Sequence, residues 1–201
     1  MAGRRQERST ETEQALKSAA RRLFAERGYL NTKITDITAA AGRAAGSFYN
    51  HFAGKEEILQ ALLNDLEAEG DVSAESPDHK PDFTDPEAVR YHVDSYWSFA
   101  RHNWAVLRAT SQAALVSEDF ARIVSDFGAQ QRMGIRDHLD GFPAAGLELP
   151  GSPDVSLAIM FLATSALLQA VEDGALDVTD EQAVDALTRF IYRGLTGRDI
   201  T

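Results

Sequence analysis

The string DITAAAGRAAGSFYNHFAGKEEIL, residues 36–59, decides the fold expected for this chain. A short helix is expected over residues 32–41, and Gly42 ends it. After that tight turn, residues 44–52 can form a second short helix. Two short helices joined by a turn of about three to four residues that contains glycine make a helix-turn-helix unit, whose second helix can enter a DNA major groove.

Two longer helices are expected on either side of this unit. Thr10 and the glutamate three residues later have the spacing of a capping box, which predicts a helix over residues 11–27. A further helix with an apolar stripe is expected over residues 55–69. Between them, Phe48 and Phe52 lie four positions apart and are expected to face the core that the four helices share.

The second short helix carries the small side chains that a DNA-reading helix needs. Its first four residues are Ala44, Ala45, Gly46 and Ser47, and they allow the backbone to approach the floor of the groove. Ser47 can hydrogen-bond a base edge, and Ala45 can contact a thymine methyl group. Arg43, at the turn, is either a reader of guanine or phosphate or a solvated turn residue.

These residues resemble the first-domain signature of the tetracycline-repressor (TetR/AcrR) family of bacterial transcription regulators. The resemblance covers about 50 residues and includes the motif LFAERGY, the pair Ala41-Gly42, the pair His51-Phe52 and Lys55. It implies an effector-responsive regulator, in the first place a repressor, that binds a palindromic operator as a homodimer and is released by a small molecule. Position by position, the resemblance and the donor chemistry together give these expected DNA contacts: Thr32, Arg43, Ala44, Ala45, Gly46, Ser47, Tyr49, Asn50, His51 and Lys55.

The sequence departs from the family pattern at two places. Where the family has an apolar residue followed by Ser or Thr, this chain has Arg43 and Ala44, so a hydrophobic anchor and a helix cap are both missing. Gly54 replaces the usual serine before Lys55 and is a weaker cap. Both changes leave the expected fold intact and make the operator sequence harder to infer.

The total charge of the chain disfavours a nucleic-acid partner, but the distribution of that charge does not. The chain of 201 residues has a net charge of −11, and an acidic surface repels phosphate. Residues 1–55, however, hold ten Lys and Arg against five acids, a net of +5, whereas the other 146 residues have a net of −16. The pattern indicates a basic contact module on an acidic body. Arg4, Arg5 and Arg8 either extend that module as a basic arm or form a solvated tail.

The rest of the chain is also predicted to be helical, which gives an all-α fold of about nine helices. We expect a helix-turn-helix DNA-binding domain over residues 1–54 and a helical effector-binding and dimerisation domain over residues 55–201. The helix of residues 55–69 connects them, and residues 70–85 are rich in Asp, Pro and Ser and are expected to form a loop.

Two carboxyl-terminal helices carry the expected dimer interface. Ser152 and Pro153 are expected to open the first, and Thr179 and Gln182 have the spacing of a capping box that opens the second. Residues 155–171 contain no charged side chain, and this stretch is shorter than the roughly 20 apolar residues of a membrane span. A helix buried on nearly all sides, partly by a second copy, is therefore preferred over a membrane helix, and a monomer with a thick core is the alternative. The expected interface residues are Leu157, Phe161, Leu168, Leu187, Phe190 and Ile191.

Aromatic side chains in the second half of the chain suggest where a small, largely apolar effector binds. Aromatic residues at helical spacing also occur in ordinary cores, and both interpretations remain open. The expected pocket residues are Tyr96, Trp97, Arg101, Trp104, Phe127, Met133 and Phe161.

Several classes of function are not expected. The chain has no cysteine, and its five histidines lack the sequence spacing of metal ligands. It has no glycine-rich phosphate loop and no HExxH motif, so neither an enzyme nor a cofactor or metal is predicted. The amino terminus lacks the apolar stretch of a signal peptide, which favours a cytoplasmic protein. The alternative function is a small-molecule binding or sequestering protein whose helix-turn-helix no longer reads DNA.

Overall fold

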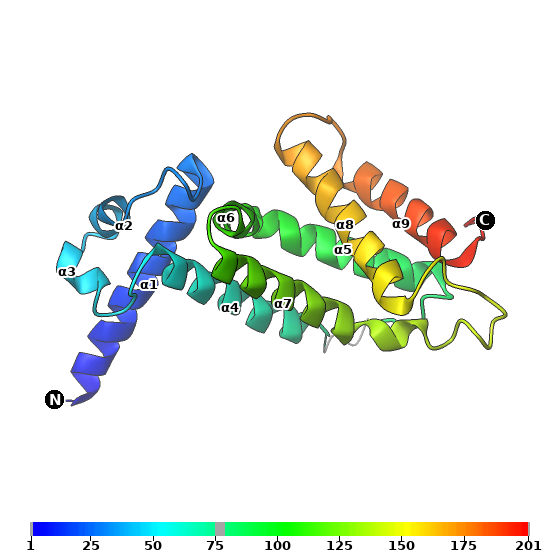
Figure 1. The fold of residues 1–201 in the computed structure, drawn as a ribbon, viewed down its shortest axis with the longest axis horizontal. Helices are drawn as coiled ribbons and strands as arrows, with labels where there is room; N and C mark the ends of the chain where they lie inside the picture. The colour runs from blue at the N-terminus through cyan, green and yellow to red at the C-terminus, as the bar shows by residue number, and fades with distance from the viewer. Residues whose placement is uncertain (1, 75–78, 201) are drawn as a thin grey trace. The chain divides into compact units, whose positions relative to one another are not determined.

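The computed structural model describes residues 2–74 and 79–200, and within them the fold is all-helical, with nine α-helices, one 3-10 helix and no strand (Figure 1). The expected all-α class is confirmed. Contacts divide the chain into two compact units. Unit 1 consists of Met1–Val72 and Asn103–Asp126, and unit 2 consists of Ser73–His102 and Phe127–Thr201.

Unit 1 surrounds the helix-turn-helix with three longer helices. Its elements are α1 (Ala2–Arg27), α2 (Ile34–Ala40), α3 (Ala45–Phe48), most of α4 (Lys55–Ala74), α6 (Trp104–Ala114) and the first half of α7 (Glu118–Gly134). Helix α1 contacts both α2 and α6. The fully buried apolar side chains include Leu16, Phe24, Ile37, Phe48, Ile58, Leu62, Leu66 and Phe120.

Unit 2 is a layer of packed helices around α5 (Pro86–His102). Helix α5 contacts α8 (Pro153–Glu172) and α9 (Asp180–Thr196), and the 3-10 helix η1 (Arg136–Leu139) contacts α8. Both carboxyl-terminal helices begin at the caps that the sequence indicates. The Ser152 hydroxyl accepts from Val155 N, and Thr179 and Gln182 form a reciprocal capping box.

Three helix boundaries differ from the sequence-based expectation. Helix α1 begins at Ala2 rather than after Thr10, and the Thr10 hydroxyl donates to the Gln6 carbonyl 3.2 Å away. A threonine inside a helix can bond back to the residue four positions earlier in this way, so its presence did not mark a start. Helix α3 has four residues and is followed by a turn, and α4 continues to Ala74 instead of ending at residue 69.

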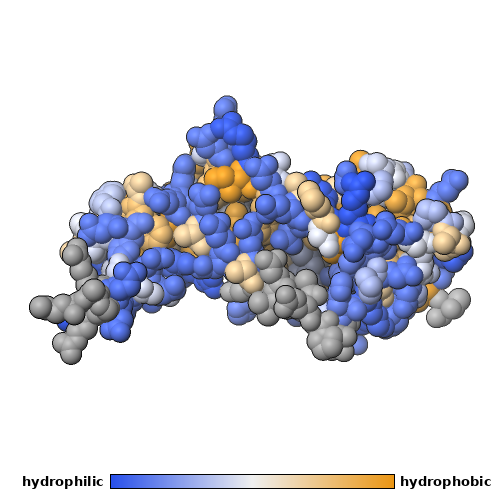
Figure 2. All heavy atoms as spheres, turned by 90° about the horizontal axis from the view of Figure 1, so that it is seen from below, coloured by the Kyte–Doolittle hydropathy of each residue, from blue (hydrophilic) through white to orange (hydrophobic). Residues whose placement is uncertain are grey.

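The compact units also group the helices differently from a division at residue 54. Most of α4 and the whole of α6 belong to the same compact unit as the helix-turn-helix. Residues 79–85 are non-helical, in agreement with the expected loop, and residues 75–78 lie outside the described part. The face of the molecule that Figure 2 shows is mostly hydrophilic, with separated apolar patches.

Candidate nucleic-acid interface

The turn between α2 and α3 is held by backbone contacts. Gly42 has a φ of 63°, a left-handed conformation that favours glycine, and Arg43 N donates to the Thr38 carbonyl at 2.9 Å. At the start of α2, Lys33 N donates to Asp36 Oδ2 at 3.1 Å. No side chain caps α3, which begins after Ala44. The missing cap that the sequence indicates is therefore confirmed.

One side of α3 is buried and the other is exposed. Phe48 is fully buried, and Phe52 is 5% exposed, as their spacing predicts. The exposed side consists of small residues followed by two polar side chains, and Tyr49 is 62% exposed. We call this side the recognition face, and it consists of Ala44, Ala45, Gly46, Ser47, Tyr49 and Asn50.

Gly46 occupies the most open position of the recognition face. A methyl group built at Gly46 meets no heavy atom within 4 Å, and its φ is not positive. The fold of the chain therefore does not require glycine at this position. A small residue here instead allows another molecule to approach the backbone of α3 closely.

Ser47, within the recognition face, and Arg43, next to it, are turned toward their own chain. The Ser47 hydroxyl donates to the Ala44 carbonyl at 2.7 Å. The Arg43 guanidinium lies 3.6 Å from Glu11 of α1, and its buried Nε has no hydrogen-bond partner. In this structure Arg43 connects the turn to α1, which is neither of the two roles that the sequence left open.

Thr32 and His51 both have partners within their own chain, and their expected DNA contacts stay predictions. Thr32 is 1% exposed, and its hydroxyl donates to the Gly28 carbonyl at 2.8 Å, so it closes the turn that precedes α2. The His51 side chain is 11% exposed, and its Nδ1 lies 4.0 Å from Glu13 of α1. Both residues were expected to touch DNA, but packing against α1 takes up most of each side chain.

Lys55, the first residue of α4, also has an internal role. Its Nζ donates to the carbonyls of Tyr29 and Thr32 at 2.7 and 2.9 Å and lies 4.1 Å from the centroid of the Tyr29 ring. Burial lowers the pKa of Lys55, and burial together with Glu56 raises the pKa of Tyr29 to about 12. Lys55 therefore fastens the turn before α2 to the start of α4 in this structure, and its expected phosphate contact stays a prediction.

Replacing Lys55 with methionine should destabilise unit 1. The variant keeps much of the side-chain volume but removes the donor to the buried Thr32 carbonyl, and an unpaired buried group costs about 1–3 kcal/mol. We expect a loss of that size in the free energy of unfolding, measured by urea denaturation. Lys33→Met, at an exposed lysine, is the matched control. Equal stability of Lys55→Met and the parent would contradict the internal role.

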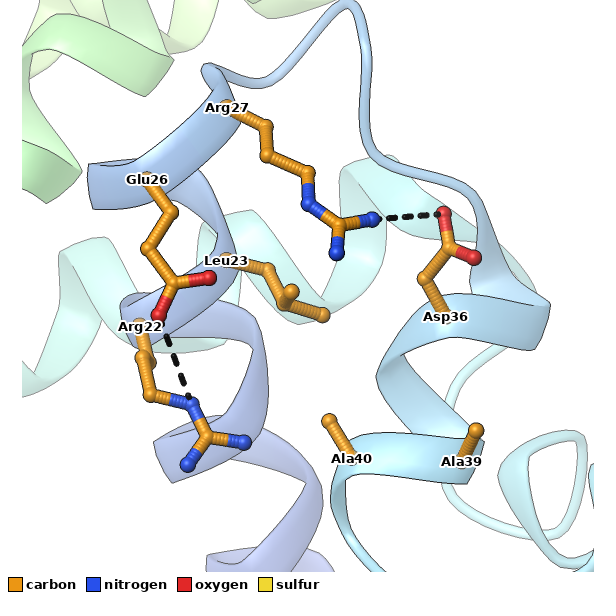
Figure 3. Close-up of a pocket in the computed structure, with 7 residues that line it drawn as sticks. All are labelled: Arg22, Leu23, Glu26, Arg27, Asp36, Ala39 and Ala40. Atoms are coloured by element: carbon orange, nitrogen blue, oxygen red, sulfur yellow. Dashed lines mark ion pairs between the residues drawn. The ribbon is translucent and has the colours of Figure 1, made fainter.

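A shallow hollow of about 340 Å³ lies between α1 and α2. The residues that line it form two ion pairs, Arg22 with Glu26 and Arg27 with Asp36, each with a nitrogen-to-oxygen distance of 3.9 Å (Figure 3). The Arg27–Asp36 pair connects the last turn of α1 to the first turn of α2. Because its arginines already face carboxylates, the hollow is not an anion site, and we assign it a packing role.

The expected effector residues are divided between the two units. Trp104 belongs to unit 1, whereas the other six belong to unit 2. Met133 is 72% exposed, and Trp97 is buried with its Nε1 donating to Asp180 at 2.9 Å. Arg101 pairs with Asp180 and Glu172. The Tyr96 ring packs edge-on against Phe161, and the Tyr96 hydroxyl lies 2.9 Å from Ser165.

An apolar face on α8 and α9 is left uncovered by the chain. The sequence placed Leu157, Leu168, Leu187 and Ile191 at a dimer interface, but these four are buried in the core of unit 2. Phe190 is 66% exposed and Phe161 is partly exposed. We call the exposed set the open apolar face, and it consists of Val155, Ile159, Leu162 and Phe190, each at least 51% exposed.

Helix α8 is long and apolar enough to cross a membrane by length and composition alone. Only 28% of its most apolar 18-residue window is buried within the chain. One side of the helix, however, is packed in the core of unit 2, where Leu157 and Leu168 are almost completely buried. A helix with one packed side and one open apolar side is typical of a subunit contact.

Unit 2 contains a cluster of three histidines that was not predicted from the sequence. His79, His92 and His138 place one ring nitrogen each within 4.8 Å of the others. They are separated by 13 and 46 positions, so no local spacing indicated that they meet.

Among the side chains of the expected basic arm, those of Arg4 and Arg5 lie outside the described residues, and Arg8 is exposed.

The buried Phe48, the glycine turn and the exposed small residues of α3 define a helix-turn-helix domain of the DNA-binding type. Residues 16–62 match the model of the tetR family of bacterial regulatory proteins. The HTH-type transcriptional repressor DhaR of Mycobacterium sp. is 44% identical over 62 residues, which cover 29% of this chain and 31% of DhaR. Over residues 16–62 the chain is therefore similar to the tetR family.

Solved structures extend the likeness in fold to nearly the whole chain. A TetR family transcription regulator from Marinobacter aquaeolei has a TM-score of 0.69 at 19% identity and covers 96% of this chain and 100% of its own. A protein from Saccharomonospora viridis, solved in complex with choline, has a TM-score of 0.72 at 21% identity, with 94% and 100% coverage. In contrast, the first curated relatives are matched over only 31–40% of their lengths.

Proposed function

We propose that the protein is a cytoplasmic transcriptional regulator that binds an operator in double-stranded DNA through the recognition face. The observation that carries this proposal is the open position of Gly46. It lies between small residues on α3, a helix whose other side is buried. Tyr49 and Asn50, at the end of that face, supply donors for phosphate oxygens. The net charge of +5 over residues 1–55 supplies the long-range attraction, and the acidic remainder repels DNA.

The proposed regulator is a homodimer held by the open apolar face. Burying half of a large apolar side chain stabilises an association by about 1 kcal/mol. The four members of the face occur twice in a symmetric pair, because a two-fold contact uses the same surface on both copies. A second copy also explains why an apolar helix as long as α8 is covered on one side only.

We further propose that a small-molecule effector binds unit 2 and lowers the affinity for the operator. An effector acts in this way when it binds the DNA-incompetent arrangement more tightly. The choline complex of the S. viridis protein supports a small-molecule site in this fold, although its identity of 21% supports the fold alone and not choline as the ligand. The Tyr96–Phe161 pair, with the Tyr96 hydroxyl near Ser165, is the part of unit 2 that we assign to it.

A titration of duplex DNA with the full chain tests the proposed function. We expect tighter binding to the DNA upstream of its own gene than to a shuffled duplex, with affinity that falls as salt rises. Tyr49→Ala and Asn50→Ala should each weaken specific binding about tenfold, because each removes one phosphate hydrogen bond worth about 1–1.5 kcal/mol. Fluorescence anisotropy measures both quantities.

Asn64→Ala, at an exposed asparagine on α4, is the matched control and should bind as the parent does. Equal affinity for the two duplexes would contradict operator recognition. It would favour the alternative, a small-molecule sequestering protein whose helix-turn-helix does not read DNA.

A further inference from the structure

Three histidines that are distant in sequence converge in unit 2. His79 precedes α5, His92 lies within α5, and His138 lies in η1. Their ring centroids are 4.7–5.1 Å apart. His138 is 2% exposed, whereas the other two are partly exposed, so the cluster is anchored in the core and open to solvent at one side.

The ring nitrogens are oriented as they are in metal-binding histidines. His92 Nδ1 lies 2.9 Å from the Ala88 carbonyl, and His138 Nδ1 lies 2.8 Å from the Asp137 carboxylate. Each Nδ1–H is thereby donated to an oxygen, and this leaves the lone pair on Nε2. A backbone carbonyl or a carboxylate in this position is the usual outer partner that fixes the tautomer of a ligating histidine.

The spacing of the nitrogens suits one ion. His79 Nε2 and His138 Nε2 are 2.9 Å apart. Two nitrogens that each lie 2.0–2.1 Å from the same metal are separated by about 2.9 Å at a right angle and about 3.3 Å at the tetrahedral angle. Shifts of a few tenths of an ångström would bring these two nitrogens to the tetrahedral spacing. The His92 nitrogen lies within 4.8 Å of both and has to move closer by up to about 1.5 Å.

We propose that His79, His92 and His138 form a binding site for one divalent transition ion of the zinc type, with at least one coordination position left open. Imidazole is a preferred ligand of zinc, nickel and copper, whereas magnesium and calcium select oxygen. This site is separate from the recognition face and stands independently of DNA binding.

Ring packing alone is the competing explanation of the cluster. Phe83 contacts both His92 and His138 edge-on, at 5.0 and 5.2 Å, and Tyr91 lies 5.2 Å from His92. Without an ion, His79 Nε2–H donates to His138 Nε2, whose Nδ1–H donates to Asp137, so these contacts also form a hydrogen-bonded chain. The two explanations differ in whether the chain takes up an ion.

The test is a titration of the full untagged chain, stripped with a chelator, with Zn²⁺ and separately with Co²⁺. We expect one ion per chain, a visible absorption band with Co²⁺, and a higher melting temperature with bound metal. His79→Gln and His92→Gln should lose stoichiometric binding. Asp137→Asn, which alters the outer partner, should weaken affinity about 10–100-fold.

His102→Gln is the matched control, since His102 is an exposed histidine at the end of α5 and lies outside the cluster. It should bind the ion as the parent does. Far-UV circular dichroism of the apo variants separates loss of a ligand from loss of fold, and His79, which precedes the helix, is the least disruptive position. Absence of stoichiometric uptake by the parent, or unchanged uptake by folded His79→Gln, would overturn the proposal.

Discussion

Replacing Gly46 with leucine should abolish specific DNA binding while leaving the chain folded. The new side chain would extend into open space in the free protein, since its Cβ has no neighbour within 4 Å. In a complex it would stand between α3 and the bases and would prevent the close contacts that distinguish one base pair from another. Each such contact is worth about 1–3 kcal/mol, so we expect at least a 100-fold loss of affinity.

Two further variants make this experiment specific. Gly46→Ala should raise the stability of α3 by about 0.5–1 kcal/mol and reduce DNA affinity less than leucine does. Gly134→Leu, at an exposed helical glycine that also has no neighbour within 4 Å, should leave DNA binding unchanged. Binding of Gly46→Leu with parental affinity would show that α3 does not approach the bases.

Replacing Leu162 with glutamate should convert the proposed dimer to monomers. Leu162 is 68% exposed, so the free chain accommodates the carboxylate in water. A symmetric interface would bury two such carboxylates without partners, and burying a charge in this way is costly. We expect the dimer dissociation constant to rise at least about 100-fold, which corresponds to about 2.7 kcal/mol. Sedimentation equilibrium measures it.

Leu115→Glu is the control for this prediction. Leu115 is 81% exposed and lies in unit 1, outside the open apolar face. It should leave the assembly unchanged, and loss of DNA affinity should accompany dissociation only in Leu162→Glu. A parent chain of 22.0 kDa that sediments as a monomer at micromolar concentration would contradict the proposed interface.

The features predicted well from sequence are those that local chemistry determines. Gly42 can adopt a positive φ, and two phenylalanines four positions apart share one face of a helical segment. The Thr179–Gln182 capping box likewise acts between near neighbours. The spacing of these residues was therefore enough to place the helix-turn-helix and the start of α9 before any tertiary contact was known.

The features that were missed depend on contacts between distant segments. Lys55 has the charge of a phosphate contact, but its partners are the carbonyls of Tyr29 and Thr32, more than 20 residues away. Helix α8 is apolar around most of its circumference, so periodicity did not show which side its own unit covers. That ambiguity placed Leu157 and Leu168 at the interface and left Ile159 and Leu162 out.

Selection of duplexes from a random library by the full chain tests operator recognition most directly. We expect enrichment of a palindrome whose half-sites are about 34–36 Å apart, or about one helical turn, bound by two chains per duplex. Recovery of the library without enrichment, under salt conditions in which the chain is a folded dimer, would contradict the proposal that this protein is a sequence-specific regulator.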